Sequence, residues 1–402
     1  MADVDPNRGF LWRAQRVFLY IGIVYVAGAS LLLLPYFQRH VVFMHLAQWP
    51  LFAEFDAPHY YGLAPFKTVN LKLTTADNVN IGAWYVLSEP AYKAIGGISR
   101  SSPPTSEEVS KSLKDHPTVL FFHGNAANRA IQYRVQMYGS VSAQLGANVL
   151  VIDYRGFGDS EGTPTEEGVN LDALASWKWL VDNGANPQDI VVMGHSLGTG
   201  IATKLVTQLQ TEGVEPRALV VVAPFSSIEA LFASYSLGGL IPLFRPLQII
   251  PFVDKLVAKY IHTRFSTIDL IGQIRVPTLL VHAKDDTTIP YSHSGHLFEA
   301  ILDPYLPAWP FDTKDILKTL ALTAEQLQEL SKVAASRMAR LNELVTTKVI
   351  GPSDALFANV KRFKAQSVDA TFALLEKGDH SPIVRFEGVL GLVGQVAGIG
   401  RN

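Results

Sequence analysis

The chain has 402 residues, and its formal net charge is −2 because 34 basic residues oppose 36 acidic ones. This near-balance argues against a nucleic-acid-binding protein, which normally carries a strong basic excess. The sequence contains no cysteine, which excludes disulfides, thiolate metal sites and a cysteine nucleophile.

The first predicted element is a long apolar helix near the N-terminus. Residues 17–34 (VFLYIGIVYVAGASLLLL) carry no charge, and at about 1.5 Å per residue such a helix is roughly 27 Å long, just enough to cross a bilayer core. Arg8, Arg13 and Arg16 precede this run, whereas only Arg39 follows it closely. The positive-inside rule therefore predicts a cytosolic tail at residues 1–16 and a transmembrane signal anchor at residues 17–35. A cleaved signal peptide and a buried core helix are the alternatives.

Residues 36–402 are predicted to form one domain in which short apolar runs alternate with helical segments such as residues 165–183 and 197–210. This alternation predicts an α/β fold with a mostly parallel central sheet flanked by helices. The first two runs have no helix between them and should form an antiparallel edge. The predicted strands are residues 67–75, 80–87, 118–122, 148–152, 190–193, 218–223, 278–282 and 370–375.

Two segments depart from this alternation. Residues 225–274 are rich in Phe, Leu, Ile and Pro and are predicted to form an apolar cap over the carboxyl edge of the sheet. Residues 303–366 are predicted to be a helical insertion, in which Thr323 and Gln326 form a capping box. The apolar stripe that follows, from Leu327 to Val345, is expected to pack against the domain. Residues 99–114 are predicted to be a polar surface loop.

The pattern G-x-S-x-G occurs twice, at Ser160 and at Ser196, so the pattern alone does not identify a nucleophile. Ser160 lies in a glycine-rich loop between two carboxylates that would oppose an oxyanion, and we predict a turn there. Ser196 follows the apolar run 190–193 and precedes a helix of small and apolar residues. This strand–turn–helix context is that of a nucleophile elbow, so Ser196 is the predicted nucleophile. A purely structural Gly-Ser turn is the alternative.

A serine nucleophile needs a base and an acid, which in the α/β-hydrolase fold follow the serine in the order acid, then histidine, each just after a later strand. Asp285 and Asp286 follow the run 278–282, and we favour Asp286, with Asp285 as a capping or solvated neighbour. His380 follows the last predicted strand and is the only histidine after His296. It is therefore the predicted base, with an ordinary surface-loop histidine as the alternative.

The oxyanion hole of this fold needs two backbone donors. The first is the N–H of Leu197, which follows the serine. The second is expected from the loop after residues 118–122, where Gly124 allows the backbone to turn and Asn125 provides the N–H. His123 precedes the nucleophile in the chain, and a packing role is expected for it.

The run of motifs resembles the α/β-hydrolase domain-containing protein 12 family, and the resemblance covers roughly residues 66–302 and 368–385. Members of that family are integral-membrane lysophosphatidylserine and monoacylglycerol lipases. The resemblance implies Ser196, Asp286 and His380 as the triad and a catalytic domain in the lumen of the endoplasmic reticulum. The matching motifs are His123-Gly124-Asn125-Ala126, Asp153-Tyr154-Arg155-Gly156, Gly158-Asp159-Ser160, Gly162-Thr163-Pro164, Gly194-His195-Ser196-Leu197-Gly198-Thr199-Gly200 and His282-Ala283-Lys284-Asp285-Asp286.

The sequence departs from the family pattern in two places. Residues 303–366 are longer and more helical than the family pattern, and Gly-Asp-His-Ser around His380 is not the family's usual motif. Related members thirteen and seventeen of the same group, the latter depalmitoylating enzymes, share the His-Gly-Asn-Ala run.

These observations predict a membrane-bound serine hydrolase that cleaves the acyl ester of a single-chain lipid through an acyl-enzyme. The resemblance and the apolar cap favour monoacylglycerol or a lysophospholipid such as lysophosphatidylserine as substrate. No metal, cofactor or nucleic-acid partner is expected, and the sequence makes no prediction of oligomeric state. Arg129, Arg134 and Arg155 are candidates to meet an anionic headgroup, with structural or solvated roles as the alternative. An acyl-protein thioesterase or other carboxylesterase, and a catalytically silent scaffold, are the competing functions.

Overall fold

The computed structural model describes residues 11–31, 34–234, 236–237, 241–242, 260–311, 323–366 and 368–400. Its centre is a ten-stranded sheet with the order β1-β2-β4-β3-β5-β6-β9-β12-β11-β10. The strands are β1 Thr68–Thr74, β2 Asn80–Val86, β3 Thr118–Phe122, β4 Asn148–Ile152, β5 Ile190–His195, β6 Ala218–Val222, β9 Thr278–Ala283, β10 Val345–Ile350, β11 Ala358–Ala365 and β12 Val368–Leu375.

The six middle strands, from β4 to β12 in the sheet order, pair in parallel. The outer strands β1 and β2 on one side, and β11 and β10 on the other, pair antiparallel. Every residue of β3, β4, β5, β6 and β9 is buried, as expected of parallel strands covered on both faces. The predicted mostly parallel sheet with an antiparallel edge is confirmed.

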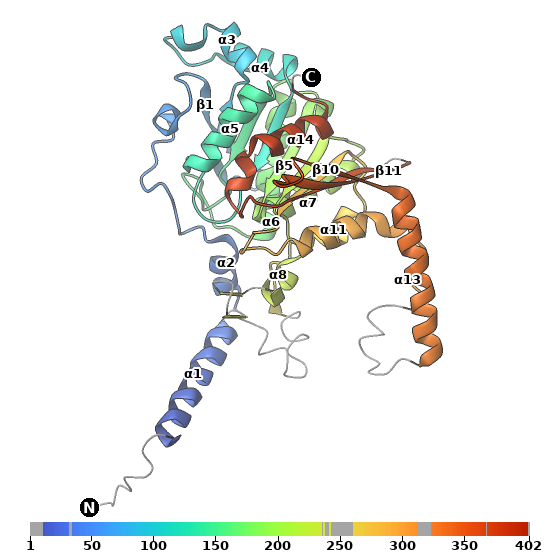
Figure 1. The fold of residues 1–402 in the computed structure, drawn as a ribbon. Coiled ribbons are helices and arrows are strands. Elements are labelled where there is room, and N and C mark those ends of the chain that lie inside the picture. Colours follow the sequence, from blue (N-terminus) through green and yellow to red (C-terminus); the bar gives the residue numbers. More distant parts are fainter. Residues whose placement is uncertain are drawn as a thin grey trace, which may run out of the picture.

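Helices cover both faces of this sheet (Figure 1). One face packs against α5 and α14, and the other against α6, α7 and α11, because alternate residues of each strand point to opposite faces. The helices are α1 Leu11–Leu31, α2 Pro35–Phe43, α3 Glu89–Ala94, α4 Ser106–Asp115, α5 Gln132–Gln144, α6 Glu166–Asp182, α7 Leu197–Thr211, α8 Ile228–Ser234, α10 Thr267–Ile271, α11 Ser292–Leu302, α13 Ala324–Leu344 and α14 Glu387–Ala397, with 3-10 turns η2 Pro58–Tyr61, η3 Gly97–Ser99, η4 Pro187–Asp189, η6 Asp303–Tyr305 and η7 Pro382–Arg385.

The predicted helical insertion at residues 303–366 is only partly helical. The capping box of Thr323 and Gln326 does begin α13. However, Val345 starts β10, and β10 and β11 form an antiparallel hairpin that extends the sheet beyond β12. The hairpin was missed because its residues are mostly polar and exposed, so their period-2 pattern carries little hydrophobic contrast.

The expected packing of the whole α13 stripe is wrong. No residue of α13 is buried, and Leu327 and Met338 are more than half exposed. Only the C-terminal end of the helix, with Leu341 and Leu344, packs against the core. In Figure 1 the helix extends away from the sheet. Residues 312–322, which belong to the same insertion, lie outside the described part of the chain.

Residues 99–114, predicted to be a loop, contain most of α4. A capping box formed by Thr105 and Glu108 begins this helix, and Val109 and Leu113 bury its apolar side. The helix was missed because its composition is polar, although the Thr-x-x-Glu signature was present in the sequence.

The N-terminal segment forms α1, which extends away from the rest of the molecule. The next helix, α2, lies between α1 and the domain (Figure 1). Among the described residues, no helix combines the length and the apolar character needed to cross a bilayer. Residues 1–10 of the predicted tail (1–16) and residues 32–33 of the predicted anchor lie outside the described part of the chain. The same holds for residues 235, 238–240 and 243–259 of the predicted cap, whose described remainder includes α8, α10 and the short strand pair β7 Ser236–Leu237 and β8 Ile241–Pro242.

Candidate active site

Ser196 lies at the sharp turn between β5 and α7. Its backbone has φ 51° and ψ −120°, a conformation that side chains rarely adopt. A Cβ on Gly194 would lie 2.3 Å from the carbonyl oxygen of Gly198, and a Cβ on Gly198 would lie 2.0 Å from that of Phe122. Only glycine fits at both positions, and the pair therefore allows the strained serine to sit at the carboxyl end of the sheet.

His380 connects Ser196 to Asp286. The His380 Nε2 lies 2.9 Å from Ser196 Oγ, and Nδ1 lies 2.8 Å from Asp286 Oδ2. Because a carboxylate only accepts hydrogen bonds, Nδ1 carries the proton and Nε2 presents its lone pair to the serine hydroxyl. The three side chains come from the loops that follow β5, β9 and β12, and parallel strands bring these loops to one edge of the sheet.

The Asp286 carboxylate is held by four donors. Its Oδ1 accepts the N–H groups of Thr288 and Ile289, each at 2.8 Å, while Oδ2 also lies 3.2 Å from Nε2 of His282. Burial raises the pKa of Asp286, but hydrogen bonds from His282 and His380 outweigh that effect and hold the pKa well below its ordinary value. Asp286 is therefore ionised at neutral pH.

Asp285 has a different position from its neighbour. Its Oδ1 accepts the N–H groups of Gly378 and Asp379, at 2.9 and 3.0 Å, and so caps the turn that carries His380. Of the two aspartates left open by the sequence, Asp286 is the one that contacts the histidine.

His195, next to the serine in the chain, supports the backbone of His380. Its Nε2 donates to the His380 carbonyl oxygen at 2.9 Å, and the two rings lie 5.2 Å apart between centroids. Burial, together with the nearby His380, lowers the pKa of His195 to about 3. The ring is therefore neutral at physiological pH.

The two predicted oxyanion donors lie at the start of α7 and in the loop after β3. Leu197 is the first residue of α7, so its N–H has no partner within the helix. In the loop after β3, the N–H groups of Ala126, Ala127 and Asn128 donate to the carbonyls of Phe43, Ala47 and Trp49, respectively. No hydrogen bond within the described residues uses the N–H of Asn125, and this group stays available to a ligand.

The segment that supplies those three carbonyls is the N-terminal strap, residues 42–49. It begins with the last two residues of α2, and the Val42 carbonyl also accepts a hydrogen bond from the Asn125 side chain at 3.4 Å. This contact braces the loop after β3 against the strap.

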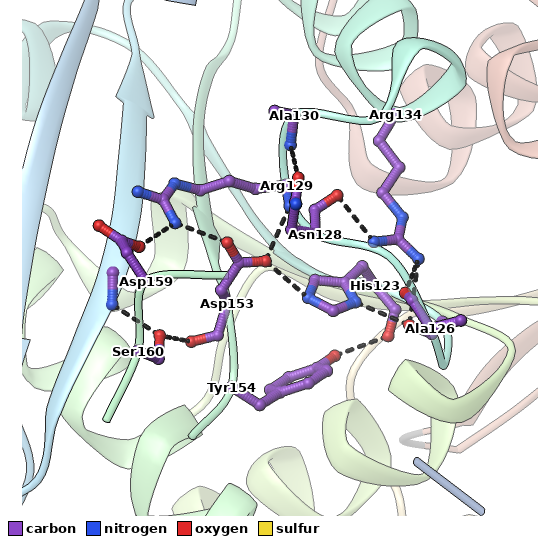
Figure 2. A network of polar contacts seen from close by, with 12 residues as sticks. His123, Ala126, Asn128, Arg129, Ala130, Arg134, Asp153, Tyr154, Asp159 and Ser160 are labelled. Carbon is purple, nitrogen blue, oxygen red and sulfur yellow. Dashed lines mark hydrogen bonds and ion pairs between the residues drawn. The ribbon is translucent and has the colours of Figure 1, made fainter. Parts of the chain in front are cut away.

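Ser160, the other G-x-S-x-G serine, belongs to a polar network in which Arg129, Asp153 and His123 are buried (Figure 2). Ser160 Oγ donates to the Asp153 carbonyl at 2.6 Å and accepts the N–H of Gly82 at 2.8 Å. Asp153 and Asp159 both bind the guanidinium of Arg129, and His123 is packed beside Asp153 without exposure to solvent. Ser160 thus joins the turn to β2 and contacts no residue that could act as its base.

The three arginines considered for a headgroup are all buried. Arg129 is bound to Asp153 and Asp159, and Arg155 to Asp77 and Asp172. Arg134 donates to backbone carbonyls of the loop after β3. None of them presents a free guanidinium to a substrate, so the structural alternative holds for all three.

The site has no arrangement suited to a metal ion. Within the part of the chain that the structure describes, no three His, Asp or Glu side chains are grouped as metal ligands.

A depression of about 550 Å³ lies among α3, α5 and the C-terminal segment, but its lining includes none of Ser196, Asp286 and His380. The chemistry is therefore assigned from the serine, not from that depression.

Sequence inspection overlooked several residues around the site. No catalytic role was assigned to His282 from the sequence, yet its Nε2 contacts Asp286 and its Nδ1 bonds Ser294 Oγ at 2.6 Å. Neither the contact of His195 with His380 nor the N-terminal strap was expected. These contacts join segments up to 185 residues apart, and no local pattern reports them.

Comparison with known proteins defines the class first. Residues 117–237 match the family model described as the alpha/beta hydrolase fold. A solved alpha-beta hydrolase from Vibrio vulnificus superposes with a TM-score of 0.52 at 16% identity, covering 90% of this chain and 92% of that one. The fold is that of the α/β hydrolases.

The curated relatives define the family more closely. Lysophosphatidylserine lipase ABHD12 of Danio rerio is 32% identical over 317 residues, which are 74% of this chain and 78% of the relative. The protein of the same name from Xenopus tropicalis is 34% identical and covers 73% of each chain. Protein ABHD12B of Homo sapiens is 32% identical over 59% of this chain and 63% of its own length. The chain belongs to the ABHD12 family of α/β hydrolases.

Proposed function

We propose that this protein is a membrane-bound serine hydrolase that cleaves the acyl ester of a single-chain lipid, with Ser196 as nucleophile, His380 as base and Asp286 as the orienting acid. The observation that carries the proposal is the continuous hydrogen-bonded path from Ser196 Oγ through both ring nitrogens of His380 to Asp286. A turn serine without catalytic function would not require this path.

The reaction follows from the geometry in two steps. His380 Nε2 takes the proton of Ser196 Oγ as the oxygen attacks the acyl carbonyl, and Asp286 stabilises the imidazolium that forms. The N–H groups of Leu197 and Asn125 receive the oxyanion. His380 then protonates the departing alcohol, and water activated by the same nitrogen releases the fatty acid from Ser196.

The substrate class is supported by the relatives and by the composition of the cap. The similar proteins of fish, frog and mammals are named lysophosphatidylserine lipases. The cap, residues 225–274, is rich in apolar side chains, which suit an acyl chain. A lysophospholipid such as lysophosphatidylserine, or a monoacylglycerol, is therefore the proposed substrate.

We also propose that residues 17–35 anchor the chain in a membrane, with the N-terminus in the cytosol and the hydrolase domain in the lumen of the endoplasmic reticulum. The side chains of α1 support an anchor because Phe18, Leu19 and Val24 are each more than 60% exposed. The arginines that precede the run support the orientation.

Activity is tested by labelling the full-length protein in membranes with a fluorophosphonate probe and by a substrate panel. The panel contains lysophosphatidylserine, other lysophospholipids, monoacylglycerol, an acyl thioester and a peptide. We expect labelling of wild-type protein, none of Ser196→Ala, and the fastest turnover with a single-chain lipid ester. Preferred cleavage of the thioester would favour the acyl-protein thioesterase alternative, and folded protein that stays unlabelled would favour the silent scaffold.

The orientation is tested with an engineered glycosylation site, because the natural sequence has no Asn-x-Ser/Thr sequon. Pro104→Asn creates a sequon just before α4, on the solvent-exposed turn at Thr105. A lumenal domain predicts a mass shift that an endoglycosidase reverses. Unglycosylated Pro104→Asn protein with normal activity would contradict the lumenal placement.

A further inference from the structure

Arg134, on α5, is a buried cation without a carboxylate partner in the described part of the chain. Only 1% of its surface is exposed, and its guanidinium donates to backbone carbonyls instead. Nη1 bonds the carbonyl of Asn128 at 3.0 Å, and Nη2 lies 3.2 Å from that of Gly124 and 3.0 Å from that of Ala126. Arg129, equally buried, is by contrast neutralised by Asp153 and Asp159.

Burying a charge without an ion-pair partner costs folding free energy, so a functional reason for Arg134 is to be expected. Desolvating a cation costs several kcal/mol, which carbonyl dipoles offset only in part. Burial also prevents the guanidinium of Arg134 from reaching a substrate directly. Its effect on the reaction must therefore pass through the loop whose carbonyls it binds.

The direction of one peptide group connects Arg134 to the nucleophile. Within the described residues the only cis peptide is Trp49-Pro50, so the Gly124–Asn125 peptide is trans and its C=O and N–H point in opposite directions. The Gly124 carbonyl faces Arg134 Nη2 and also His123 Nδ1, at 2.7 Å. The Asn125 N–H consequently points away from the cation.

Gly124 lies directly against the nucleophile on the other side. A Cβ placed on Gly124 would be 3.2 Å from Ser196 Cβ, and the carbonyl of the same residue lies 3.2 Å from Arg134 Nη2, so Gly124 contacts both the serine and the guanidinium. The next three N–H groups of the loop, from Ala126 to Asn128, are occupied by the N-terminal strap. Within the described residues, no hydrogen bond uses the N–H of Asn125, which immediately precedes these three groups.

We propose that Arg134 is a positioning residue for the oxyanion hole: it holds the Gly124–Asn125 peptide with its N–H towards the oxyanion and places a positive charge behind that peptide. This inference rests on the proposed serine-hydrolase function. Negative charge develops on the tetrahedral intermediate only as it forms, so the cation favours the transition state over the bound substrate.

The test uses full-length protein with a soluble p-nitrophenyl ester, which removes any effect of lipid delivery. Arg134→Met should lower kcat about 10²–10³-fold with KM within about threefold, the range for loss of one oxyanion donor. Arg134→Lys keeps the charge but lacks the planar guanidinium that reaches the four carbonyls of Gly124, Asn125, Ala126 and Asn128, and it should lose an intermediate 10–100-fold in kcat. Tyr133→Phe is the matched control, because it removes only the 3.1 Å contact to Arg134 Nε and should keep kcat within about threefold.

A trifluoromethyl ketone, which forms a tetrahedral adduct with the serine, separates positioning from structure. Its affinity should fall in proportion to kcat/KM across the variants, whereas a general loosening of the fold would not produce this proportionality. Folded Arg134→Met with wild-type kcat, or with unchanged ketone affinity, would overturn the inference. If Arg134→Met does not fold, Arg134→Lys decides, and wild-type kcat and ketone affinity in that variant overturn it. A wild-type protein that hydrolyses no ester would instead contradict the proposed function itself.

Discussion

The two G-x-S-x-G sequences of this chain adopt opposite backbone arrangements. Around Ser160 the two glycines have positive φ, 54° at Gly158 and 79° at Gly162, and the serine does not. Around Ser196 the serine itself has the positive φ of 51°, and the glycines provide space instead. In the first motif glycine absorbs the unusual conformation of a turn, whereas in the second it permits a strained serine.

The hydroxyls of Ser160 and Ser196 also have different hydrogen-bond partners. Ser160 Oγ donates a hydrogen bond to the Asp153 carbonyl and accepts one from the Gly82 N–H. In the described structure, Ser196 Oγ bonds only the His380 ring, which can remove its proton. The same five-residue pattern thus holds a structural turn together at Ser160 and presents the proposed nucleophile at Ser196, and the packing around each serine makes the difference.

The largest expected effect is that of Ser196→Ala. Loss of the nucleophile of a triad lowers kcat by about 10⁶-fold in a comparable serine hydrolase, and the fluorophosphonate should no longer bind covalently. The melting temperature of this variant serves as the control for folding. Covalent labelling that persists in Ser196→Ala would show that another residue, with Ser160 as the first to test, is the nucleophile.

Asp286→Asn is expected to lower kcat by about 10⁴-fold, because an amide favours the wrong tautomer of His380. The neighbouring variant Asp285→Asn is the matched comparison. Asp285 contacts only the turn before His380, so this change should cost less than about tenfold. Steady-state kinetics on the same ester measure both variants, and equal losses would remove the distinction made between the two aspartates.

Ser160→Ala should affect stability and leave catalysis nearly unchanged. Removal of the hydroxyl leaves the Gly82 N–H and the Asp153 carbonyl without this partner, which costs about 1–3 kcal/mol in the free energy of unfolding. Urea unfolding measures this loss, and kcat of the folded protein should stay within about threefold. A kcat reduced a hundredfold in stable Ser160→Ala protein would refute a purely structural role.

The smallest effect concerns His195, the neutral neighbour of Ser196. The folded pKa of about 3 lies below the ordinary value of 6.5, so the unfolded chain takes up a proton that the folded chain does not. The stabilisation is complete above pH 6.5 and is lost as the pH falls towards 3. Between pH 6.5 and 5.5 wild-type protein should lose about 1 kcal/mol more unfolding free energy than His195→Gln. Parallel pH profiles for the two proteins would exclude this linkage.

Much of the fold was predictable because it depends on local patterns. Eight of the ten strands of the main sheet were anticipated, since a buried strand must be a short apolar run. The hairpin of β10 and β11 escaped because its exposed residues carry no such signal. The capping box before α13 was readable, but the position of that helix relative to the body was not, because an amphipathic stripe does not specify its partner.

The sequence by itself determined the strand, the turn and the helix around Ser196, and the order of acid and base along the chain. These depend on glycine sterics and hydrophobic periodicity, which act over a few residues. Only the tertiary structure separated Asp286 from Asp285 and brought Arg134, His282 and the N-terminal strap to the site. These contacts join distant segments through single hydrogen bonds and buried charges. The packing of the sheet and its loops decides which groups become partners.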